Sequence, residues 1–227
     1  MRIKITFEGG GKKLPSHNQH MVNGFIHSCL GDNNEYHDSK NTYAVSMLNG
    51  GKLYKHGIFS YDYKANIIVS GDAIFLSKIV DGVMKLGNFN GMKLLNIEFI
   101  QEELFNGINH FATLSPILLK RDNKRFATLN DDDYQNLLES QIKSKVRSIL
   151  PDEDTSNIHV FVNKNGSKTK LVKLRDVKNI GNVHHLSIEC NKKVAELLYR
   201  VGIGQSTGAG FGTIYKTGNK SIYFDEK

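Results

Sequence analysis

The chain has 227 residues and a formal net charge of +7, with 30 Lys and Arg against 23 Asp and Glu. This length suits one large domain or two packed units of about 100 residues each. Hydrophobic residues make up 39% of the chain, yet no apolar run approaches the roughly 20 residues that a membrane-spanning helix needs. The composition therefore predicts a soluble protein, and the excess positive charge favours a polyanionic partner such as nucleic acid.

The N-terminus and the cysteines bear on the compartment and on metal binding. Met1 is followed by an alternating, strand-like run and not by the apolar stretch of a secretory signal, so we expect a cytoplasmic protein. Cys29 and Cys190 lie outside any Cys-x-x-Cys spacing, which predicts two buried thiols instead of a disulfide or a zinc site. His17 and His20 have a spacing that could ligate a metal, but no third ligand is evident. We predict no metal site and no cofactor.

The first half of the chain predicts the order β-α-β-β-α-β. After the opening strand, Gly9 to Lys13 predicts a flexible basic break. His17 to Leu30 predicts an amphipathic helix, because apolar residues recur there at helical spacing along one face. The remaining predicted elements are strands at Thr42 to Leu48, Ile58 to Tyr63 and Asn66 to Ser70, a helix at Asp72 to Leu86 and a strand at Lys93 to Ile100.

The second half predicts the same order of elements. Its clearest helix runs from Asp131 to Leu150, where one apolar stripe ends at Pro151. A hairpin is predicted around Asn165-Gly166, a dipeptide that suits a tight turn with positive φ. The predicted strands are Phe111 to Leu119, Ile158 to Lys164, Lys168 to Lys178, Val183 to Glu189 and Gly212 to Thr217, and a second helix is predicted at Lys192 to Val201.

This repeated order is that of the ferredoxin-like (RRM-like) unit. We therefore predict an α+β fold of two tandem ferredoxin-like domains, each βαββαβ, at residues 1–105 and 106–227. No sequence repeat relates the halves, so this prediction depends on the order of the elements alone.

The segment from Gly202 to Gly212 holds five glycines in eleven residues. Glycine lets backbone N–H groups approach and enclose a phosphate. No Gly-Lys-Ser/Thr follows the run, and the run comes after a helix instead of opening one, so neither nucleotide fingerprint fits. Physical reasoning leaves two readings open: a loop that contacts phosphates, or a tightly turned connector.

The pattern Gly-Ile-Gly, five residues, then Gly-Phe-Gly resembles the signature of the CRISPR-associated endoribonucleases of the Cas6 family. The opening strand, Leu14-Pro15 with the following Asn23 to Ile26, and Phe111 to Ile117 resemble segments of that family in the same order, so the resemblance spans the chain. It implies tandem ferredoxin-like domains and cleavage of CRISPR precursor RNA within each repeat. It also implies metal-independent attack by the 2′-hydroxyl, which gives a 2′,3′-cyclic phosphate, a 5′-hydroxyl and a mature guide RNA.

Such a reaction needs an acid, a base and a cation, and histidine suits the proton transfers because its unperturbed pKa is near 6.5. The resemblance implies a catalytic histidine in the N-terminal domain just after the first helix, and His37 occupies that place. His27, on the non-core face of that helix, is the second candidate. Lys40 or Tyr36 could stabilise the phosphorane. For each of these side chains, simple exposure to solvent is the alternative.

The segment around Asn165-Gly166 is rich in lysine, and we expect one basic face that binds RNA phosphates, with Val172 and Leu174 on the other face. An ordinary solvated strand face is the alternative. Together with the glycine-rich segment, the predicted RNA-binding residues are Lys164, Lys168, Lys170, Lys173, Arg175, Gly202, Gly204, Gln205, Ser206, Thr207, Gly210 and Gly212.

Two other functions remain open from the sequence. One is a catalytically inactive ferredoxin-like RNA-binding subunit of a CRISPR effector complex. The other is a metabolic ferredoxin-like enzyme, which would need a small-molecule pocket and would leave the lysines unexplained. The expected partner is CRISPR repeat RNA, and the sequence leaves open other Cas effector subunits and a homodimer.

Overall fold

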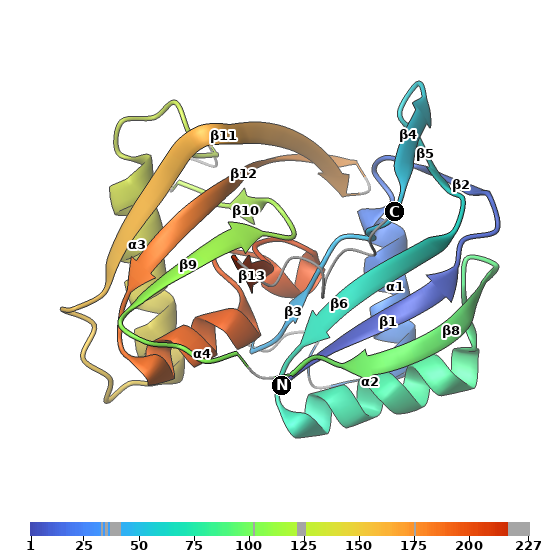
Figure 1. The fold of residues 1–227 in the computed structure, drawn as a ribbon, viewed down its shortest axis with the longest axis horizontal. Helices are drawn as coiled ribbons and strands as arrows, with labels where there is room; N and C mark the ends of the chain where they lie inside the picture. The colour runs from blue at the N-terminus through green and yellow to red at the C-terminus, as the bar shows by residue number, and fades with distance from the viewer. Residues whose placement is uncertain are drawn as a thin grey trace.

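The structure is a computed structural model that describes residues 1–32, 34, 36, 42–101, 103–121, 126–174 and 176–217. The predicted α+β fold is confirmed. Two ferredoxin-like units lie next to each other, each an antiparallel sheet with two helices packed against it (Figure 1). Among the described helices, none is long and apolar enough to cross a membrane.

The N-terminal unit is built around its first strand, which lies in the middle of a five-stranded sheet of order β3-β6-β1-β8-β7. Ile3, Ile5 and Phe7 alternate toward the helices and are fully buried. The strands are β1 (Arg2–Glu8), β3 (Ala44–Val45), β6 (Lys64–Ser70), β7 (Asn88–Phe89) and β8 (Met92–Phe99).

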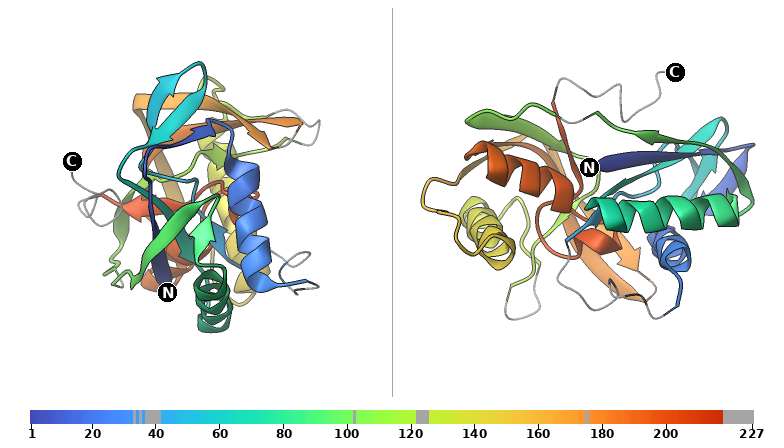
Figure 2. Two further views of the ribbon diagram at one scale, coloured as in Figure 1. Left: turned by 90° about the vertical axis from the view of Figure 1, so that its right-hand side faces the viewer. Right: turned by 90° about the horizontal axis from the view of Figure 1, so that it is seen from below.

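Helices α1 (Gln19–Leu30) and α2 (Ala73–Leu86) cover one face of this sheet (Figure 2). The side chain of Asp72 caps α2 by accepting a hydrogen bond from the backbone N–H of Phe75. At Gly82 the two helices approach so closely that a Cβ atom would lie 2.2 Å from the carbonyl oxygen of Cys29. Both helices were predicted, and α1 begins two residues later than expected.

A second, three-stranded sheet of order β2-β5-β4 projects from this unit (Figure 1). The prediction of a flexible break at Gly9 to Lys13 is wrong, because the backbone N–H of Gly9 donates to the carbonyl of Tyr63 (2.7 Å) and the next residues turn into β2. Strand β4 was not predicted either. The strands are β2 (Lys12–Pro15), β4 (Lys52–Lys55) and β5 (Ile58–Tyr61).

In the C-terminal unit, the long strand β12 pairs with β11 on one side and with β9 and β10 on the other, and β13 pairs with β9. Helices α3 and α4 pack on this sheet around Leu138, Ile142 and Leu198. The elements are β9 (Ile108–Thr113), β10 (Ile117–Leu118), α3 (Tyr134–Ile149), β11 (His159–Leu174), β12 (Val177–Glu189), α4 (Lys192–Val201), the short 3-10 helix η1 (Thr207–Ala209) and β13 (Ile214–Lys216).

The predicted hairpin turn at Asn165-Gly166 is wrong. Strand β11 continues through this dipeptide as an irregularity, where the five residue steps from Asn163 to Lys168 oppose two steps in β12. The side chains of Asn163 and Ser167 form hydrogen bonds inside the bulge, from the N–H of Asn165 to Asn163 Oδ1 (2.9 Å) and from Ser167 Oγ to the Asn163 carbonyl (2.6 Å). The chain reverses between the end of β11 and the start of β12. All the predicted RNA-binding lysines therefore lie along one strand.

Side chains of each unit bind the backbone of the other. The buried guanidinium of Arg2 donates to the carbonyls of Ile214 (2.7 Å) and Tyr199, and it stacks 3.7 Å from the centre of the Tyr199 ring. The hydroxyl of Thr213 donates to the carbonyl of Val45 (2.9 Å). These contacts fix the strands of one sheet against the other unit at the junction.

Candidate nucleic-acid interface

The glycine-rich segment from Gly202 to Gly212 lies at the junction of the two units, where it docks on α1. Asn23 of α1 donates from its side-chain amide to the carbonyl of Ala209 (3.3 Å), and Gln19 donates to the Asn23 side chain (3.1 Å). On the other side of η1, the hydroxyl of Thr207 donates to the carbonyl of Tyr43 (3.1 Å). The C-terminal loop is thus anchored to two elements of the N-terminal unit.

The glycines of this segment are required by packing inside the protein. Gly202, Gly204, Gly210 and Gly212 all have positive φ and are buried. A Cβ atom at Gly212 would lie 1.7 Å from the carbonyl oxygen of Ile203, and one at Gly204 would lie 2.8 Å from a backbone oxygen of β10. The exposed surface of the segment comes instead from Gln205, Ser206, Gly208 and Ala209, which are partly exposed.

Helix α3 braces the loop from the C-terminal unit. The side chain of Gln141 both donates to the carbonyl of Gly204 (3.1 Å) and accepts from its N–H (3.2 Å). Lys145 donates from Nζ to the carbonyl of Gly202 (3.2 Å), and burial lowers the pKa of this lysine to about 8. The loop is held on both sides, so its partly exposed residues form a fixed surface.

His27 lies on the side of α1 that meets this loop. It is in the last turn of the helix, four residues after Asn23, and residues four apart share a helix face. Its side chain is partly buried and is not part of the core cluster of the N-terminal unit, in agreement with its predicted place on the non-core face. The structure therefore brings a candidate proton-transfer group to the α1 surface beside the loop.

The catalytic candidates His37 and Lys40 and the RNA-binding candidate Arg175 lie outside the described residues. Tyr36 is described and is buried, with its ring centre 5.0 Å from that of Phe75 and 6.2 Å from that of Tyr43.

Tyr36 and Tyr43 come before and after His37 in the sequence, and both belong to one aromatic cluster with Phe75. Tyr43 of this cluster also contacts the glycine-rich segment, because a Cβ atom at Gly208 would lie 2.7 Å from its ring. This cluster links the two sequence regions that carry the candidate residues.

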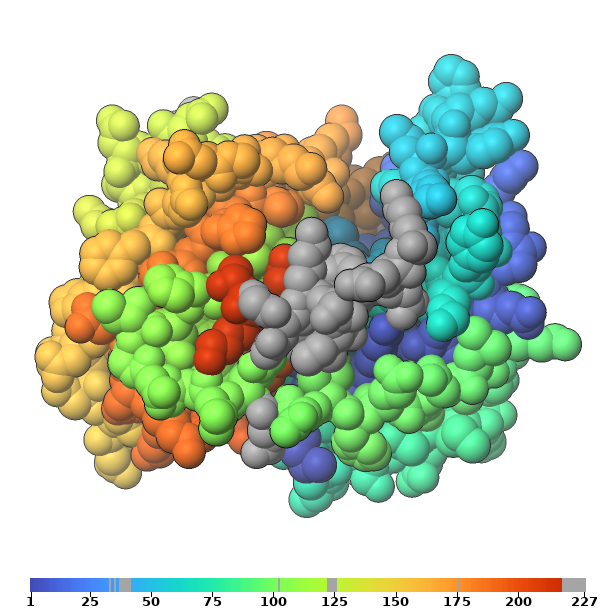
Figure 3. Space-filling view, viewed as in Figure 1, coloured from blue at the N-terminus to red at the C-terminus, as the bar shows by residue number. Residues whose placement is uncertain are grey.

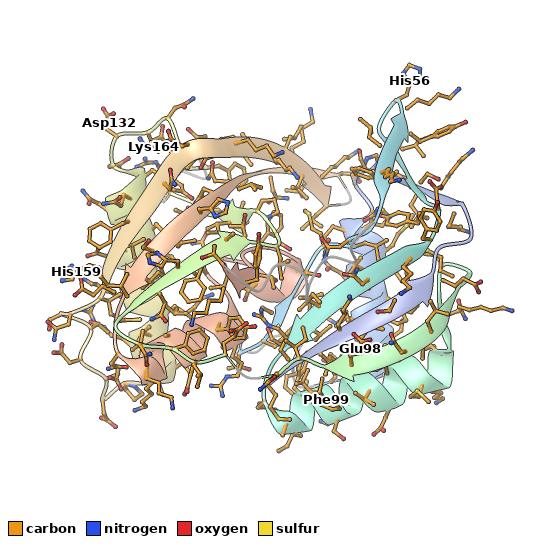
Figure 4. All side chains as sticks on the ribbon, viewed as in Figure 1. His56, Glu98, Phe99, Asp132, His159 and Lys164 are labelled. Atoms are coloured by element: carbon orange, nitrogen blue, oxygen red, sulfur yellow. The ribbon has the colours of Figure 1, made fainter. Side chains whose placement is uncertain are left out.

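The lysines of β11 divide between its two faces. Pairing with β12 is regular from Lys168 to Leu174, so Lys168 and Lys170 share a face with Val172, while Lys173 is on the opposite face. The prediction of a single basic face is therefore wrong. It placed Lys173 with Lys168 and Lys170, although side chains an odd number of residues apart in a regular strand point to opposite faces. Lys164 lies in the irregular part of the strand and is exposed (Figure 4).

The face with Lys168 and Lys170 is the one that turns toward the glycine-rich segment. Val172 packs against Phe211 of that segment and against Leu118. Burial lowers the pKa of Lys170, and the nearby charge of Lys168 lowers it further. Two ammonium groups that repel each other in this way make a site that attracts an anion.

The described residues show little sign of metal or thiol chemistry. No three His, Cys, Asp or Glu side chains among them gather as a possible ligand set. Cys29 and Cys190 are free and buried, as predicted. Burial raises the pKa of the Cys29 thiol to about 12 and that of Cys190 to about 11, so both are held as inert thiols.

Some residues that build this site were not predicted. Gln19, Asn23, Tyr43 and Gln141 hold the loop through bonds to its backbone or through close packing. The polar pair in α1 could have been noticed, since Gln19 and Asn23 are four apart and Gln19 is a polar residue at the spacing of the buried apolar stripe, three residues before Val22 and seven before Ile26. Nothing in the sequence indicates Gln141, because its partner is 63 residues away.

Comparison with known proteins places this geometry in a family. The family model described as "CRISPR associated protein Cas6, C-terminal" matches residues 100–215, just over half of the chain. No curated protein matches the sequence. A structure described as "Characterization of a Cas6-related gene from Pyrococcus furiosus" has a TM-score of 0.82 at 19% identity, and the match covers 96% of this chain and 99% of that one.

Two further structures have the same fold. One, described as "An RAMP protein binding different RNA substrates", has a TM-score of 0.81 at 18% identity, over 95% of this chain and 99% of that one. The other, described as a Cas6 product complex, has a TM-score of 0.64 at 12% identity, over 95% of this chain and 100% of that one. With the family match over residues 100–215 and tandem ferredoxin-like units throughout, this chain belongs to the CRISPR-associated Cas6 family.

Proposed function

We propose that this protein is a metal-independent endoribonuclease that cleaves CRISPR precursor RNA within its repeats. Its family supports a role in the processing or binding of CRISPR RNA. The observation that carries the proposal is a convergence at the junction of the units. The face of α1 with His27, the partly exposed part of the glycine-rich segment, and the β11 face with Lys168 and Lys170 all meet there.

The proposed reaction uses the RNA's own nucleophile. The 2′-hydroxyl of the nucleotide before the cut attacks the phosphorus, the bond from phosphorus to the 5′-oxygen breaks, and the products are a 2′,3′-cyclic phosphate and a 5′-hydroxyl. His37 and His27 would share the removal of the 2′-proton and the protonation of the leaving oxygen. Lys40 would balance charge on the phosphorane. The burial of the Tyr36 ring fits an anchoring role for this residue better than a contact with the phosphate.

The proposed RNA path follows the cationic side of the junction. Lys168 and Lys170 would contact phosphates, with Lys164 further along the same strand. Gln205 and Ser206 would contribute polar groups from the loop. The buried glycines would support this surface by close backbone packing and would not touch the RNA.

The test is incubation of the protein in EDTA with repeat RNA from its own locus, followed by mapping of both ends of each fragment. The expected result is one cut per repeat, with a 2′,3′-cyclic phosphate on the upstream fragment and a 5′-hydroxyl on the downstream fragment. A 3′-hydroxyl and a 5′-phosphate would contradict the proposed chemistry.

Tight binding without any cut would favour the second candidate, a non-cleaving RNA-binding subunit. This candidate is supported by the fold similarity to the RAMP protein described as binding different RNA substrates.

A further inference from the structure

The three-stranded sheet β2-β5-β4 carries large aromatic side chains that contribute little to any core. Tyr54 of β4 is 52% exposed, and Tyr63, just after β5, is 80% exposed. An exposed phenol ring leaves apolar surface in water, which has no benefit for folding. We call the segment from Lys52 to Tyr63, together with Lys13 of the neighbouring strand, the aromatic hairpin.

The rings of the aromatic hairpin are paired with lysines. Lys13 Nζ lies 4.1 Å from the centre of the Tyr54 ring, and Lys55 Nζ lies 5.8 Å from the same centre. Lys52 Nζ lies 5.9 Å from the centre of the Tyr63 ring. Contacts of this kind at the surface hold each ring near positive charge while leaving part of it open to solvent.

The strand register places Lys13, Lys52 and Tyr54 on one face, and Tyr63 joins them through its contact with Lys52. Lys13 and Lys52 are both opposite Ser60, one on each side of β5, so their side chains leave the sheet in the same direction. The Tyr54 ring lies against Lys13 and is therefore on this face too. Leu53 is on the opposite face, in the same row as Phe59.

The charge of this face is positive. Strands β2 and β4 hold no acidic residue and four exposed lysines, of which Lys13, Lys52 and Lys55 are on this face. Asp62, after β5, accepts a hydrogen bond from the hydroxyl of Ser60 (2.6 Å). A ligand that fits must be a polyanion with flat faces that can stack, and single-stranded nucleic acid has both properties.

We propose that the aromatic hairpin is a stacking platform for single-stranded RNA outside the cleavage site. One base stacks on the open face of Tyr54 and another on Tyr63, while Lys13, Lys52 and Lys55 contact the intervening phosphates. Base stacking on aromatic side chains tolerates any sequence, so the platform holds the strand without reading it. This inference rests on the proposed function, because it assigns a second segment of the same RNA.

The position of the platform suits this role. The hairpin projects at the rim of the N-terminal unit, on the side of the molecule where β11 ends (Figure 3). His56 marks its tip, while Lys164 lies on β11 of the other unit (Figure 4). Strand β11 runs from the end with His159 and Lys164 toward the N-terminal unit, so an RNA strand that follows its lysines in that direction can continue toward the hairpin, and its phosphates then meet cations on both units (Figures 1 and 4).

The experiment measures the affinity of the full chain for a labelled, repeat-length single-stranded RNA. The test variant is Tyr54→Ala with Tyr63→Ala, and the matched variant is Tyr54→Phe with Tyr63→Phe, which keeps both rings. Leu53→Ala, at a position on the other face of β4 that is 68% exposed, is the control. Because these side chains are exposed, all variants are expected to fold.

Loss of both rings is expected to weaken binding of single-stranded RNA by about 30-fold or more, at the lower end of what stacking of two bases contributes. The phenylalanine variant and Leu53→Ala should stay within about twofold of the wild type. Double-stranded RNA, whose bases cannot stack on a side chain, should bind equally to all of them.

An alanine variant with wild-type affinity for single-stranded RNA overturns the platform, and its lysines would then serve another ligand, such as an acidic protein. If that variant still cuts repeat RNA, the proposed nuclease stands without the platform. If the wild type binds through the tyrosines but never cuts, the platform stands without the nuclease.

Discussion

Gly212 and Gly166 both have positive φ angles, of 62° and 70°, but they have different surroundings. A Cβ atom at Gly212 would overlap the carbonyl oxygen of Ile203, whereas one at Gly166 would meet nothing within 4 Å. The sequence shows glycine at both positions and cannot separate these cases, because only folding brings the backbone of Ile203 against Gly212. This is why the sequence left two readings of the glycine-rich segment open.

Replacing Gly212 with Ala is expected to lower the free energy of unfolding by about 3 kcal/mol or more, since backbone strain and overpacking both contribute. Gly166→Ala is expected to lower the free energy of unfolding by about 1 kcal/mol, from backbone strain alone. Urea denaturation of the two variants makes the comparison. Equal losses would mean that the backbone around Gly212 can shift to accept a side chain.

His184 is a buried polar residue whose titration can be observed. Its Nε2 lies 2.9 Å from the hydroxyl of Tyr134, and burial lowers its pKa from 6.5 to about 4. Between these values the unfolded chain binds a proton that the folded chain does not, so stability falls as the pH is lowered from 6.5 toward 4. The expected slope from this group is about 1.4 kcal/mol per pH unit.

His184→Gln should remove this component of the pH dependence, and His185→Gln, at the exposed neighbouring position, should keep it. Denaturant unfolding of the wild type and both variants between pH 7 and 4.5 checks this. A wild-type slope in His184→Gln would assign the acid sensitivity to other groups.

At the scale of elements, the helices and most strands followed from hydrophobic periodicity, while register did not. The Asn165-Gly166 dipeptide predicts a reversal, but side-chain hydrogen bonds from Asn163 and Ser167 stabilise a bulge there, and β11 pairs along its length with β12. The projecting strand β4 was missed because Lys52 to Lys55 buries no side chain and so lacks the alternation of a half-buried strand.

The division of lysines between the two faces of β11 leads to a direct prediction for RNA binding. Changing Lys168 and Lys170 together to alanine should weaken RNA binding. It should also reduce the magnitude of the slope of log K against log salt concentration by about 1.4, since each lost phosphate contact with a single strand removes about 0.7. Lys173→Ala should have a smaller effect, because this lysine is on the other face and lies 3.8 Å from Asp176.

Binding titrations at several salt concentrations measure both slopes. If Lys173→Ala lowers the slope as much as the double variant does, the RNA runs along the outer face of β11 and not along the side of the glycine-rich segment.

At the scale of the whole molecule, the tandem arrangement was predicted from the repeated order of elements, but the contacts between the units were not. Arg2 alternates in β1 as a residue that should face solvent, and instead it is buried against Tyr199 and Ile214 of the other unit. Such a contact joins residues about 200 positions apart, and neither periodicity nor charge in the sequence indicates it. The candidate site could not be assembled from the sequence for the same reason, because its residues come from both units and meet only in the folded chain.

Arg2→Ala should lower the free energy of unfolding by roughly 3 kcal/mol, because it removes charged hydrogen bonds to two carbonyls and a stacked ring contact. Ser70→Ala removes one neutral hydrogen bond across the junction, to the carbonyl of Arg200 (2.6 Å), and should cost about 1 kcal/mol. Thermal and urea unfolding of both variants give the comparison. A loss for Arg2→Ala no larger than that for Ser70→Ala would show that the guanidinium does little to join the units.

The proposal that this chain cuts RNA by proton transfer at the junction is tested most directly by single-turnover cleavage of repeat RNA from its own locus in EDTA. His37→Ala should keep RNA affinity but slow cleavage by roughly 10²- to 10⁴-fold, and His27→Ala should slow it less. His159→Ala, an exposed histidine on the far side of the C-terminal unit (Figure 4), is the control and should cut at the wild-type rate. RNA with 2′-deoxyribose before the cut should bind and stay whole. Wild-type cleavage by His37→Ala, or any cleavage of the 2′-deoxy RNA, would contradict the proposed mechanism.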